Sequence, residues 1–238
     1  MDDKFFRIVG FDLDGTLVDT SGDLAAAVNF ALDAARRPLL TPEQVEPMIG
    51  GGAKHMLRLA LDATGGCDDD EFRRLYKAML GYYDAHVAVH SRPFPGAVAA
   101  LDRLADMGVT VAVVTNKFEA LAQKLLVELG LRDRFACLIG GDTLGKGNAK
   151  PSAAPLNEMI ARCGGGSAVY VGDSSYDMLA ARNAGLPVVA VSFGFLLEPV
   201  AALGADAVID HFDELVATLS ALAATWSTDA APASPAAS

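Results

Sequence analysis

Four short polar clusters contain the residue types that a phosphoryl transfer requires. In chain order they are Asp12/Asp14, Thr115/Asn116, Lys150 and Asp173/Asp177. The chemistry needs a nucleophile, a metal ion that neutralises charge, donors for the phosphoryl oxygens and a group that handles the leaving-group proton. The clusters offer a candidate for each of these roles.

The first cluster places two carboxylates one residue apart. Alternation along an extended segment puts Asp12 and Asp14 on the same side of the chain. Asp12 is then a candidate nucleophile that forms a covalent intermediate. Asp14 is the candidate acid that protonates the leaving oxygen and the base that later activates water. An Asp-x-Asp-Gly sequence is also a common turn, so this cluster alone does not exclude a structural role.

The last cluster predicts a magnesium site. Asp173 follows the short apolar run 169–172, and Mg²⁺ prefers carboxylate and carbonyl oxygens. We expect Mg²⁺ to be held by Asp12, by backbone near Asp14 and by Asp173. Asp177, one helical turn further on, is expected to orient its neighbours rather than to bind the ion. An ordinary helix cap at Asp173 is the alternative.

The two middle clusters predict phosphate contacts. Thr115 and Asn116 end the apolar run 111–114, where a hydroxyl and backbone N–H groups at a helix start suit phosphate oxygens. A Thr/Asn helix cap would have the same sequence. Lys150 precedes Pro151, which can begin a helix and keep the preceding backbone extended. A solvated surface lysine is the alternative, so the prediction depends on the order of all four clusters.

The elements that position these clusters are short buried strands alternating with helices. The predicted strands are the apolar runs 5–11, 109–114, 135–139, 168–171, 188–191 and 207–209. Such alternation is typical of an α/β fold with a doubly wound, Rossmann-like parallel sheet. The four clusters follow or stand near predicted strand ends, so the carboxyl edge of one sheet would bring them together.

A helical insertion interrupts this alternation after the first strand. Between residues 19 and 91 apolar residues recur at helical spacing, broken by Gly50-Gly51-Gly52. We therefore predict an α/β core domain formed by 1–18 and 92–226. A small all-helical cap domain spans 19–91, and 227–238, rich in Ala, Ser and Pro, is predicted to be a disordered tail.

Composition narrows the choice of partners. The 19 Lys and Arg residues against 30 Asp and Glu give a net charge of −11, which repels nucleic acid and anionic membranes. The three cysteines show no paired metal-ligand spacing and are expected to be reduced thiols in a cytoplasmic protein. We expect a small-molecule phosphate monoester as partner, no nucleic acid, no membrane, and a monomer or homodimer.

The order of the motifs resembles that of the haloacid dehalogenase superfamily. The matching segments are Asp12-Leu13-Asp14-Gly15-Thr16, Val113-Val114-Thr115-Asn116, Ala149-Lys150-Pro151 and Gly172-Asp173-Ser174-Ser175-Tyr176-Asp177. The resemblance covers almost the whole chain except the tail. It implies that Asp12 is the nucleophile and Asp14 the acid/base. It also implies that Thr115 and Lys150 bind phosphate and that Asp12, the Asp14 carbonyl and Asp173 hold Mg²⁺.

Within that superfamily the sequence is most similar to bacterial phosphoglycolate phosphatases. The similar segments are Val114-Thr115-Asn116-Lys117, Ile139-Gly140-Gly141-Asp142, the segment from Lys150-Pro151 to Ala154-Pro155-Leu156, and Ser192-Phe193-Gly194-Phe195. This implies hydrolysis of 2-phosphoglycolate to glycolate and phosphate through an aspartyl-phosphate. The sequence departs from the pattern at Ser152-Ala153 and Ser175-Tyr176, which leaves the catalytic residues in place and the substrate open.

Substrate specificity is expected to lie in the cap, because the core contacts only the phosphoryl group. Glycines before a helix let backbone amides approach an anion, and a lysine in the first turn could meet a substrate carboxylate. The candidates are Gly51, Gly52, Lys54 and Arg58. An ordinary flexible break with solvated basic residues is equally compatible. Tyr76 and Tyr83 lie on an apolar helical stripe and are expected in the core.

Other activities remain open at the sequence level. A dehalogenase of the same superfamily would need neither Asp14 nor magnesium, so Asp14 argues against it. A β-phosphoglucomutase-like phosphomutase uses the same core and differs mainly in excluding water. Phosphatases for a sugar phosphate, a nucleotide or pyrophosphate also fit. A phosphate-sensing binding module would be expected to lack some of Asp12, Asp14, Lys150 and Asp173, and all four are present.

Overall fold

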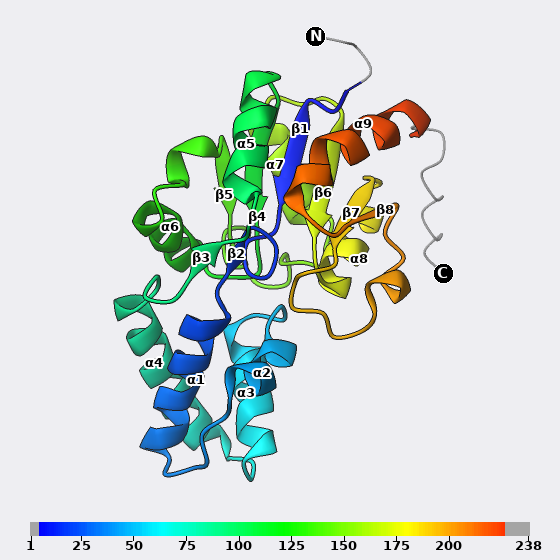
Figure 1. Ribbon diagram of the computed structural model, residues 1–238. Coiled ribbons are helices and arrows are strands. Elements are labelled where there is room, and N and C mark those ends of the chain that lie inside the picture. The colour runs from blue at the N-terminus through cyan, green and yellow to red at the C-terminus, as the bar shows by residue number, and fades with distance from the viewer. Residues whose placement is uncertain (1–4, 227–238) are drawn as a thin grey trace.

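A six-stranded parallel sheet forms the core of the molecule. The computed structural model describes residues 5–226 (Figure 1). Every neighbouring pair in the sheet is parallel, and the strand order is β5-β4-β1-β6-β7-β8. The strands are β1 (Ile8–Phe11), β4 (Thr110–Val114), β5 (Cys137–Ile139), β6 (Ala168–Gly172), β7 (Val188–Val191) and β8 (Ala207–Ile209). The predicted doubly wound α/β fold is confirmed, although β1 and β5 begin later than their apolar runs.

Helices cover both faces of the sheet, which explains why its strands are apolar throughout. Val9 and Phe11 of β1 pack into one apolar cluster, whereas Ile8 belongs to a second cluster. The first cluster includes residues of α5 (Ala97–Asp106), α6 (Glu119–Glu128) and α9 (Leu215–Thr225). The second includes residues of α7 (Ala154–Arg162) and α8 (Ser175–Asn183). Alternate residues of one strand therefore contact opposite helical layers.

The segment after the first strand is helical. It contains α1 (Ser21–Ala34), α2 (Pro42–Val45), α3 (Ala53–Ala63) and α4 (Asp69–Ala85). Asp68 begins α4 by accepting hydrogen bonds from the backbone N–H groups of Asp70 and Glu71. In Figure 1 these helices lie together below the sheet, and we refer to α1–α4 as the cap. The proposed boundaries at 18/19 and 91/92 fall in the two connections between cap and core.

Those connections run side by side. β2 (Val18–Asp19) pairs antiparallel with β3 (Arg92–Pro93), so the chain leaves and re-enters the core at one place. Asp23, buried in the first turn of α1, accepts hydrogen bonds from the backbone N–H groups of His90 and Ser91 and from the Ser91 hydroxyl. The start of the cap is thereby bound to its end.

The remaining described elements are short 3₁₀ helices. They are η1 (Glu46–Met48), η2 (Arg132–Arg134), η3 (Val200–Ala202) and η4 (Phe212–Glu214). Within residues 5–226, no helix has both the length and the apolar character needed to span a bilayer. The predicted tail 227–238 lies outside the described residues.

Candidate active site

The order of the strands brings the four polar clusters to one edge of the sheet. β1 lies between β4 and β6, so Asp12, Thr115 and Asp173 emerge from three adjacent strands. The Asp12 N–H donates to the carbonyl of Val171 at 2.9 Å, and the Thr115 N–H donates to that of Ile139 at 2.9 Å. These bonds extend the strand ladder to the residues that carry the functional side chains.

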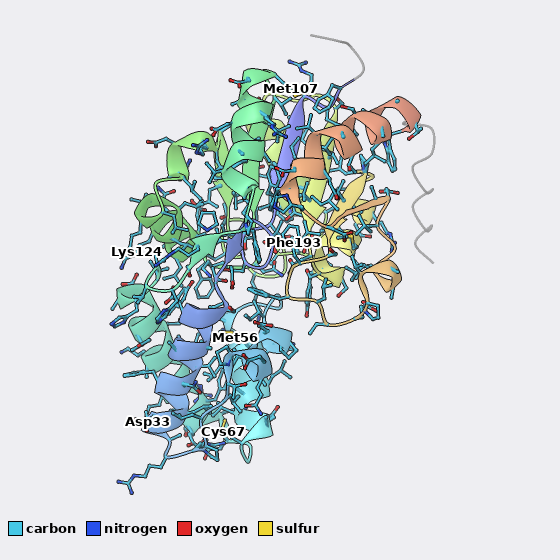
Figure 2. All side chains as sticks on the ribbon, viewed as in Figure 1. Asp33, Met56, Cys67, Met107, Lys124 and Phe193 are labelled. Atoms are coloured by element: carbon cyan, nitrogen blue, oxygen red, sulfur yellow. The ribbon has the colours of Figure 1, made fainter. Side chains whose placement is uncertain are left out.

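A cavity of about 60 Å³ lies between this edge and the cap. Its core side includes polar groups of Asp12, Asp14, Thr115 and Asn116. Its cap side is mostly apolar, with Gly50, Gly52 and the residues Leu24, Ala27, Ile49, Ala53, Met56, Met79, Leu80 and Tyr83. In Figure 2, Met56 lies at the end of the cap nearest the core, whereas Asp33 and Cys67 lie at the far end.

Lys150 is buried between two carboxylates. Its Nζ lies 2.9 Å from Asp12 Oδ1 and 2.6 Å from Asp177 Oδ1. It also donates to the Tyr170 hydroxyl at 3.1 Å, and that hydroxyl donates to the Val114 carbonyl at 2.6 Å. Burial lowers the pKa of Lys150, but Asp12 and Asp177 outweigh it and raise the pKa to about 12. The lysine is therefore a buried cation beside Asp12, and the surface alternative is wrong.

Asp12 is buried beside other negative charges. Burial raises the pKa of Asp12 to about 7. The Lys150 charge lowers this pKa, while Asp177 and Asp14 raise it. A carboxylate must be ionised to attack phosphorus. One lysine does not fully offset the burial of Asp12, so a further cation next to it would favour the reactive form.

Asp173 is held at a fixed position by two donors. Its Oδ1 accepts a hydrogen bond from the Thr16 hydroxyl at 3.0 Å, and its Oδ2 accepts one from the Phe195 N–H at 2.8 Å. Burial raises the pKa of Asp173 well above its usual range, and the charges of Asp177 and Asp12 raise it further. Burial therefore destabilises the anionic forms of both Asp12 and Asp173.

These carboxylates form a donor set that fits Mg²⁺. Asp12, Asp173 and Asp177 each offer an oxygen, and the three oxygens lie within 4.8 Å of one another. Apart from its ion pair with Lys150, the buried Asp12 Oδ1 has no hydrogen-bond partner among the described residues. Buried, oxygen-only ligands with unbalanced negative charge are what a hard divalent cation requires.

Within this set, Asp177 already has its partners. Besides the contact of Oδ1 with Lys150, its Oδ2 accepts hydrogen bonds from the backbone N–H groups of Asp173 and Ser174 and from the Ser174 hydroxyl at 2.6 Å. Ser174 and Asp177 form a capping box at the start of α8. This geometry favours the predicted role of Asp177 in orienting Lys150 and Asp173.

Asp14 has a lysine partner of its own, Lys117, which was not among the predicted site residues. Lys117 Nζ donates to Asp14 Oδ1 at 2.8 Å and to Oδ2 at 2.9 Å, and the Thr20 hydroxyl donates to Oδ1 at 2.8 Å. Burial lowers the pKa of Lys117, but Asp14 outweighs it and the net shift is upward. The two residues are 103 positions apart, so no local spacing reveals the pair. The only available signal is a lysine two residues after Thr115 at a strand end.

Tyr83 lies where the cap meets this pair. It is buried, as expected for its helical stripe, but it also lines the cavity. The Lys117 ammonium lies 4.7 Å from the centre of its ring. Burial raises the pKa of Tyr83 to about 12, and its hydroxyl has no hydrogen-bond partner among the described residues. Tyr83 is therefore both a packing residue and part of the site.

The two phosphate-binding candidates after β4 differ in their contacts. The buried Thr115 hydroxyl oxygen accepts a hydrogen bond from the Lys117 N–H at 3.2 Å. Asn116 Nδ2 donates to the carbonyls of Gly50 and Lys150 at 3.2 and 3.1 Å. Asn116 thus links a cap loop to the core. Its side-chain donors are occupied, which leaves its backbone as the group that can face phosphate.

The basic cap candidates lie away from the cavity. Lys54 is exposed, and its Nζ lies 5.6 Å from the centre of the Tyr76 ring. Arg58 stacks 3.9 Å over the Phe72 ring and pairs with Asp69 at 3.5 Å. Neither residue lines the cavity. Of the two candidate glycines, Gly52 lines it and Gly51 does not.

One local expectation needs correction. Pro151 does not begin a helix, because α7 starts at Ala154 with Pro155 in its first turn. Residues 150–153 form turns instead. The turn allows Lys150 to point back into the sheet edge, and Asn183 Nδ2 supports it by donating to the Pro151 carbonyl at 2.9 Å.

Comparison with known proteins identifies relatives across nearly the whole chain. A family model described as haloacid dehalogenase-like hydrolase matches residues 9–191. A phosphoglycolate phosphatase of Agrobacterium fabrum is 40% identical over 213 residues, covering 88% of this chain and 90% of that protein. One of Caulobacter vibrioides is 41% identical over 207 residues, covering 86% of each. The crystal structure of a predicted phosphoglycolate phosphatase from Haemophilus somnus has a TM-score of 0.84 and 32% identity, covering 90% and 97% of the two chains.

The matched region contains the strands that carry the site carboxylates. It begins in β1 and ends with β7, and it includes the cap. Asp12, Asp14, Lys150 and Asp173 all fall inside it. From the sheet order, the buried carboxylates at its edge and this match, the chain belongs to the haloacid dehalogenase-like hydrolase family.

Proposed function

We propose that this protein is a magnesium-dependent phosphatase that hydrolyses 2-phosphoglycolate to glycolate and phosphate through an aspartyl-phosphate on Asp12. The observation that carries the proposal is that Asp12 and Asp14 line one small cavity and each is paired with its own buried lysine. Two carboxylates in different surroundings can take different roles, as nucleophile and as acid/base.

The substrate is supported by the relatives and by the cavity. Both the Agrobacterium and the Caulobacter proteins are named phosphoglycolate phosphatase. A volume of about 60 Å³ is far below the roughly 300 Å³ at which pockets for drug-sized ligands begin. A leaving group of a few atoms, such as glycolate, suits that volume better than a nucleoside or a sugar chain.

In the first half of the reaction, an Asp12 oxygen attacks phosphorus and the bond to the bridging oxygen breaks. Lys150, next to Asp12, stabilises the negative charge on the phosphoryl oxygens, together with the Thr115 hydroxyl and nearby backbone N–H groups. Asp14 donates its proton to the departing glycolate oxygen. The products of this step are glycolate and phosphorylated Asp12.

In the second half, Asp14 takes a proton from water, and that water attacks the phosphorus of the aspartyl-phosphate. Inorganic phosphate leaves and the Asp12 carboxylate is restored. Lys117 and Thr20 hold Asp14 in place for both proton transfers. Mg²⁺, held by Asp12, Asp173 and the Asp14 carbonyl, would neutralise negative charge shared between the enzyme and the phosphoryl group.

Phosphate release from a panel of monoesters tests the proposal. The panel contains 2-phosphoglycolate, sugar phosphates, nucleotides and pyrophosphate, each assayed with Mg²⁺ or with EDTA, for the wild type and for Asp12→Asn. We expect a strong preference for 2-phosphoglycolate that is lost with EDTA and in the variant. Preference for a different ester, with activity still dependent on Mg²⁺ and on Asp12, would contradict the proposed substrate but support the proposed mechanism. Activity in Asp12→Asn or in EDTA would overturn the mechanism.

A further inference from the structure

The cavity next to Asp14 contains one cationic side chain. Of the residues that line it in the described part of the chain, only Lys117 carries a positive charge. Lys54 and Arg58 lie elsewhere in the cap. Lys150 Nζ is already surrounded by Asp12, Asp177 and Tyr170 on the nucleophile side. A substrate with a second negative group therefore has one candidate partner in this cavity.

We propose that Lys117 binds the carboxylate of the leaving group and that the Tyr83 hydroxyl donates a second hydrogen bond to it. Lys117 and Tyr83 would then select monoesters whose alcohol carries an acid group next to the ester carbon. This inference rests on the function proposed above, and it assigns specificity to a core lysine and a cap tyrosine in place of Lys54 and Arg58.

The position of Asp14 places Lys117 within reach of the substrate carboxylate. As the acid, Asp14 must lie within hydrogen-bond distance of the bridging oxygen. In 2-phosphoglycolate the carboxylate carbon is separated from that oxygen by one methylene carbon. A cation that contacts Asp14, as Lys117 does at 2.8 Å, lies in the region that this carboxylate reaches. An ammonium group has three N–H donors. Lys117 donates to the two Asp14 oxygens, and its remaining donor is on the side of Tyr83, where the carboxylate of the ligand would lie.

Tyr83 provides an independent observation. Its side chain is buried and lines the cavity, and its hydroxyl has no hydrogen-bond partner among residues 5–226. A buried hydroxyl without a partner is unfavourable, and such groups commonly mark the place of a ligand. Because Tyr83 is on α4 of the cap and contacts Lys117 of the core, a carboxylate bound by both would also join the two parts.

The apolar side chains of the cap explain why sugar phosphates would bind poorly in this cavity. Leu24, Met56, Met79 and Leu80 offer no hydrogen bonds to hydroxyl groups. A sugar phosphate would have to bury its hydroxyl groups against these side chains without partners, which is unfavourable. A carboxylate placed beside Lys117 and Tyr83 avoids that penalty because both of its oxygens find donors.

The test is a selectivity ratio rather than an activity. We compare kcat/KM for 2-phosphoglycolate with that for 2-hydroxyethyl phosphate, in which a neutral alcohol replaces the carboxylate, in the Mg²⁺-loaded full-length protein. We expect the wild type to favour 2-phosphoglycolate. Lys117→Met should reduce the ratio on the order of 10- to 100-fold, which corresponds to the loss of one charge-assisted hydrogen bond. Lys117→Arg should keep much of the preference, and Tyr83→Phe should reduce it less than Lys117→Met. Lys54→Met is the matched control and should leave the ratio unchanged.

The alternatives give different results. If Lys117 only positions Asp14, Lys117→Met will slow both esters equally and the ratio will stay constant, which overturns the inference. A fall of the ratio in Lys54→Met alone would overturn it as well. The wild-type ratio needs no variant to fold, so an enzyme that hydrolyses both esters equally well also refutes it. If the wild type does not hydrolyse 2-phosphoglycolate at all, the proposed function fails instead.

Discussion

Two aspartates separated by one residue meet different surroundings in this site. Asp12 is nearly enclosed, with 5% of its surface exposed, and faces Lys150 and two further carboxylates. Asp14 is held by Lys117 and Thr20 at the cavity. The proposed nucleophile therefore lies where added positive charge favours its ionised form, whereas the position of the proposed acid/base is fixed by hydrogen bonds.

Replacing Asp177 tests whether it orients the site or binds the metal directly. In Asp177→Asn, Lys150 loses one of its two negative partners. We expect Mg²⁺ to bind about 10- to 100-fold more weakly, as is typical when a partner of a metal ligand is removed. Titration of activity with Mg²⁺ measures this. Asp173→Asn should abolish binding, and Ser174→Ala, which removes one donor to Asp177, should have the smallest effect. If Asp177→Asn lost as much Mg²⁺ affinity as Asp173→Asn, Asp177 would be identified as a metal ligand.

A methyl group at Gly194 should damage the site specifically. A Cβ there would lie 2.3 Å from Asp173 Cβ and 2.6 Å from the Gly15 carbonyl oxygen, so Gly194→Ala must displace Asp173. We expect kcat/KM to fall by about 10- to 100-fold, the cost of a small misplacement of a reactive group. Gly81→Ala is the control, since a Cβ at this exposed position in α4 meets nothing within 4 Å. It should raise the free energy of unfolding by about 0.5–1 kcal/mol and leave activity unchanged.

At the scale of elements, Asp23 connects the beginning of the cap to its end. Asp23→Ala would leave the N–H groups of the exposed His90 and the buried Ser91 without their acceptor, and the Ser91 hydroxyl with only the Val87 carbonyl at 3.5 Å. We expect the free energy of unfolding to fall by about 1–3 kcal/mol, the cost of leaving one buried group, the Ser91 N–H, unsatisfied. Denaturant unfolding measures the change. Ser91→Ala removes one of these donors and should cost less; an equal cost in both variants would contradict the assignment.

The elements themselves could be predicted from the sequence to a large extent. Short apolar runs before Asp12, Thr115 and Asp173 indicated the three central strands, and their parallel order brought these residues together. This works because a strand buried on both faces must be apolar along its whole length. Boundaries were less accurate where flanking apolar residues such as Phe5 and Phe135 pack without joining the sheet.

Long-range partners were not predictable in the same way. Lys117 finds Asp14 only because β4 lies beside β1. The Phe195 N–H that holds Asp173 is a backbone donor, and a backbone donor has no side-chain signature in a sequence. Lys54 was a candidate because a lysine in the first turn of a helix could meet a substrate carboxylate, and Arg58 because it is a further basic residue of the cap. The direction in which α3 presents them depends on its packing against the rest of the cap. Residue type alone does not determine that direction.

At the scale of the whole molecule, stability should depend on pH and magnesium together. The pKa of Asp12 rises from 3.8 to about 7 on folding, and that of Asp173 also rises. Between about pH 4 and about pH 7 the folded metal-free protein therefore binds more protons than the unfolded chain, so this contribution to stability falls as pH rises. Mg²⁺ would bind these carboxylates in their ionised form. We expect it to raise the Tm more at about pH 8 than at about pH 5.

Thermal unfolding with Mg²⁺ or EDTA at both pH values measures this linkage. Asp12→Asn removes one titrating group, so its stability in EDTA should change less with pH than that of the wild type. A Mg²⁺ effect that is equal at both pH values would show that the carboxylates at the sheet edge are already ionised without the metal.

The pairing of β2 with β3 has a consequence for how proteins with this architecture could evolve. Val18 faces Pro93 and Asp19 faces Arg92, so the inserted helices enter and leave through neighbouring residues of a two-stranded ladder. A segment with adjacent ends can be exchanged for another without changing the register of β1 and β4. The helical part is therefore a segment that can be replaced as a unit. Recombination of the gene at the two ends of this segment could replace the helices and so change which phosphate ester the site accepts, while the sheet edge stays the same.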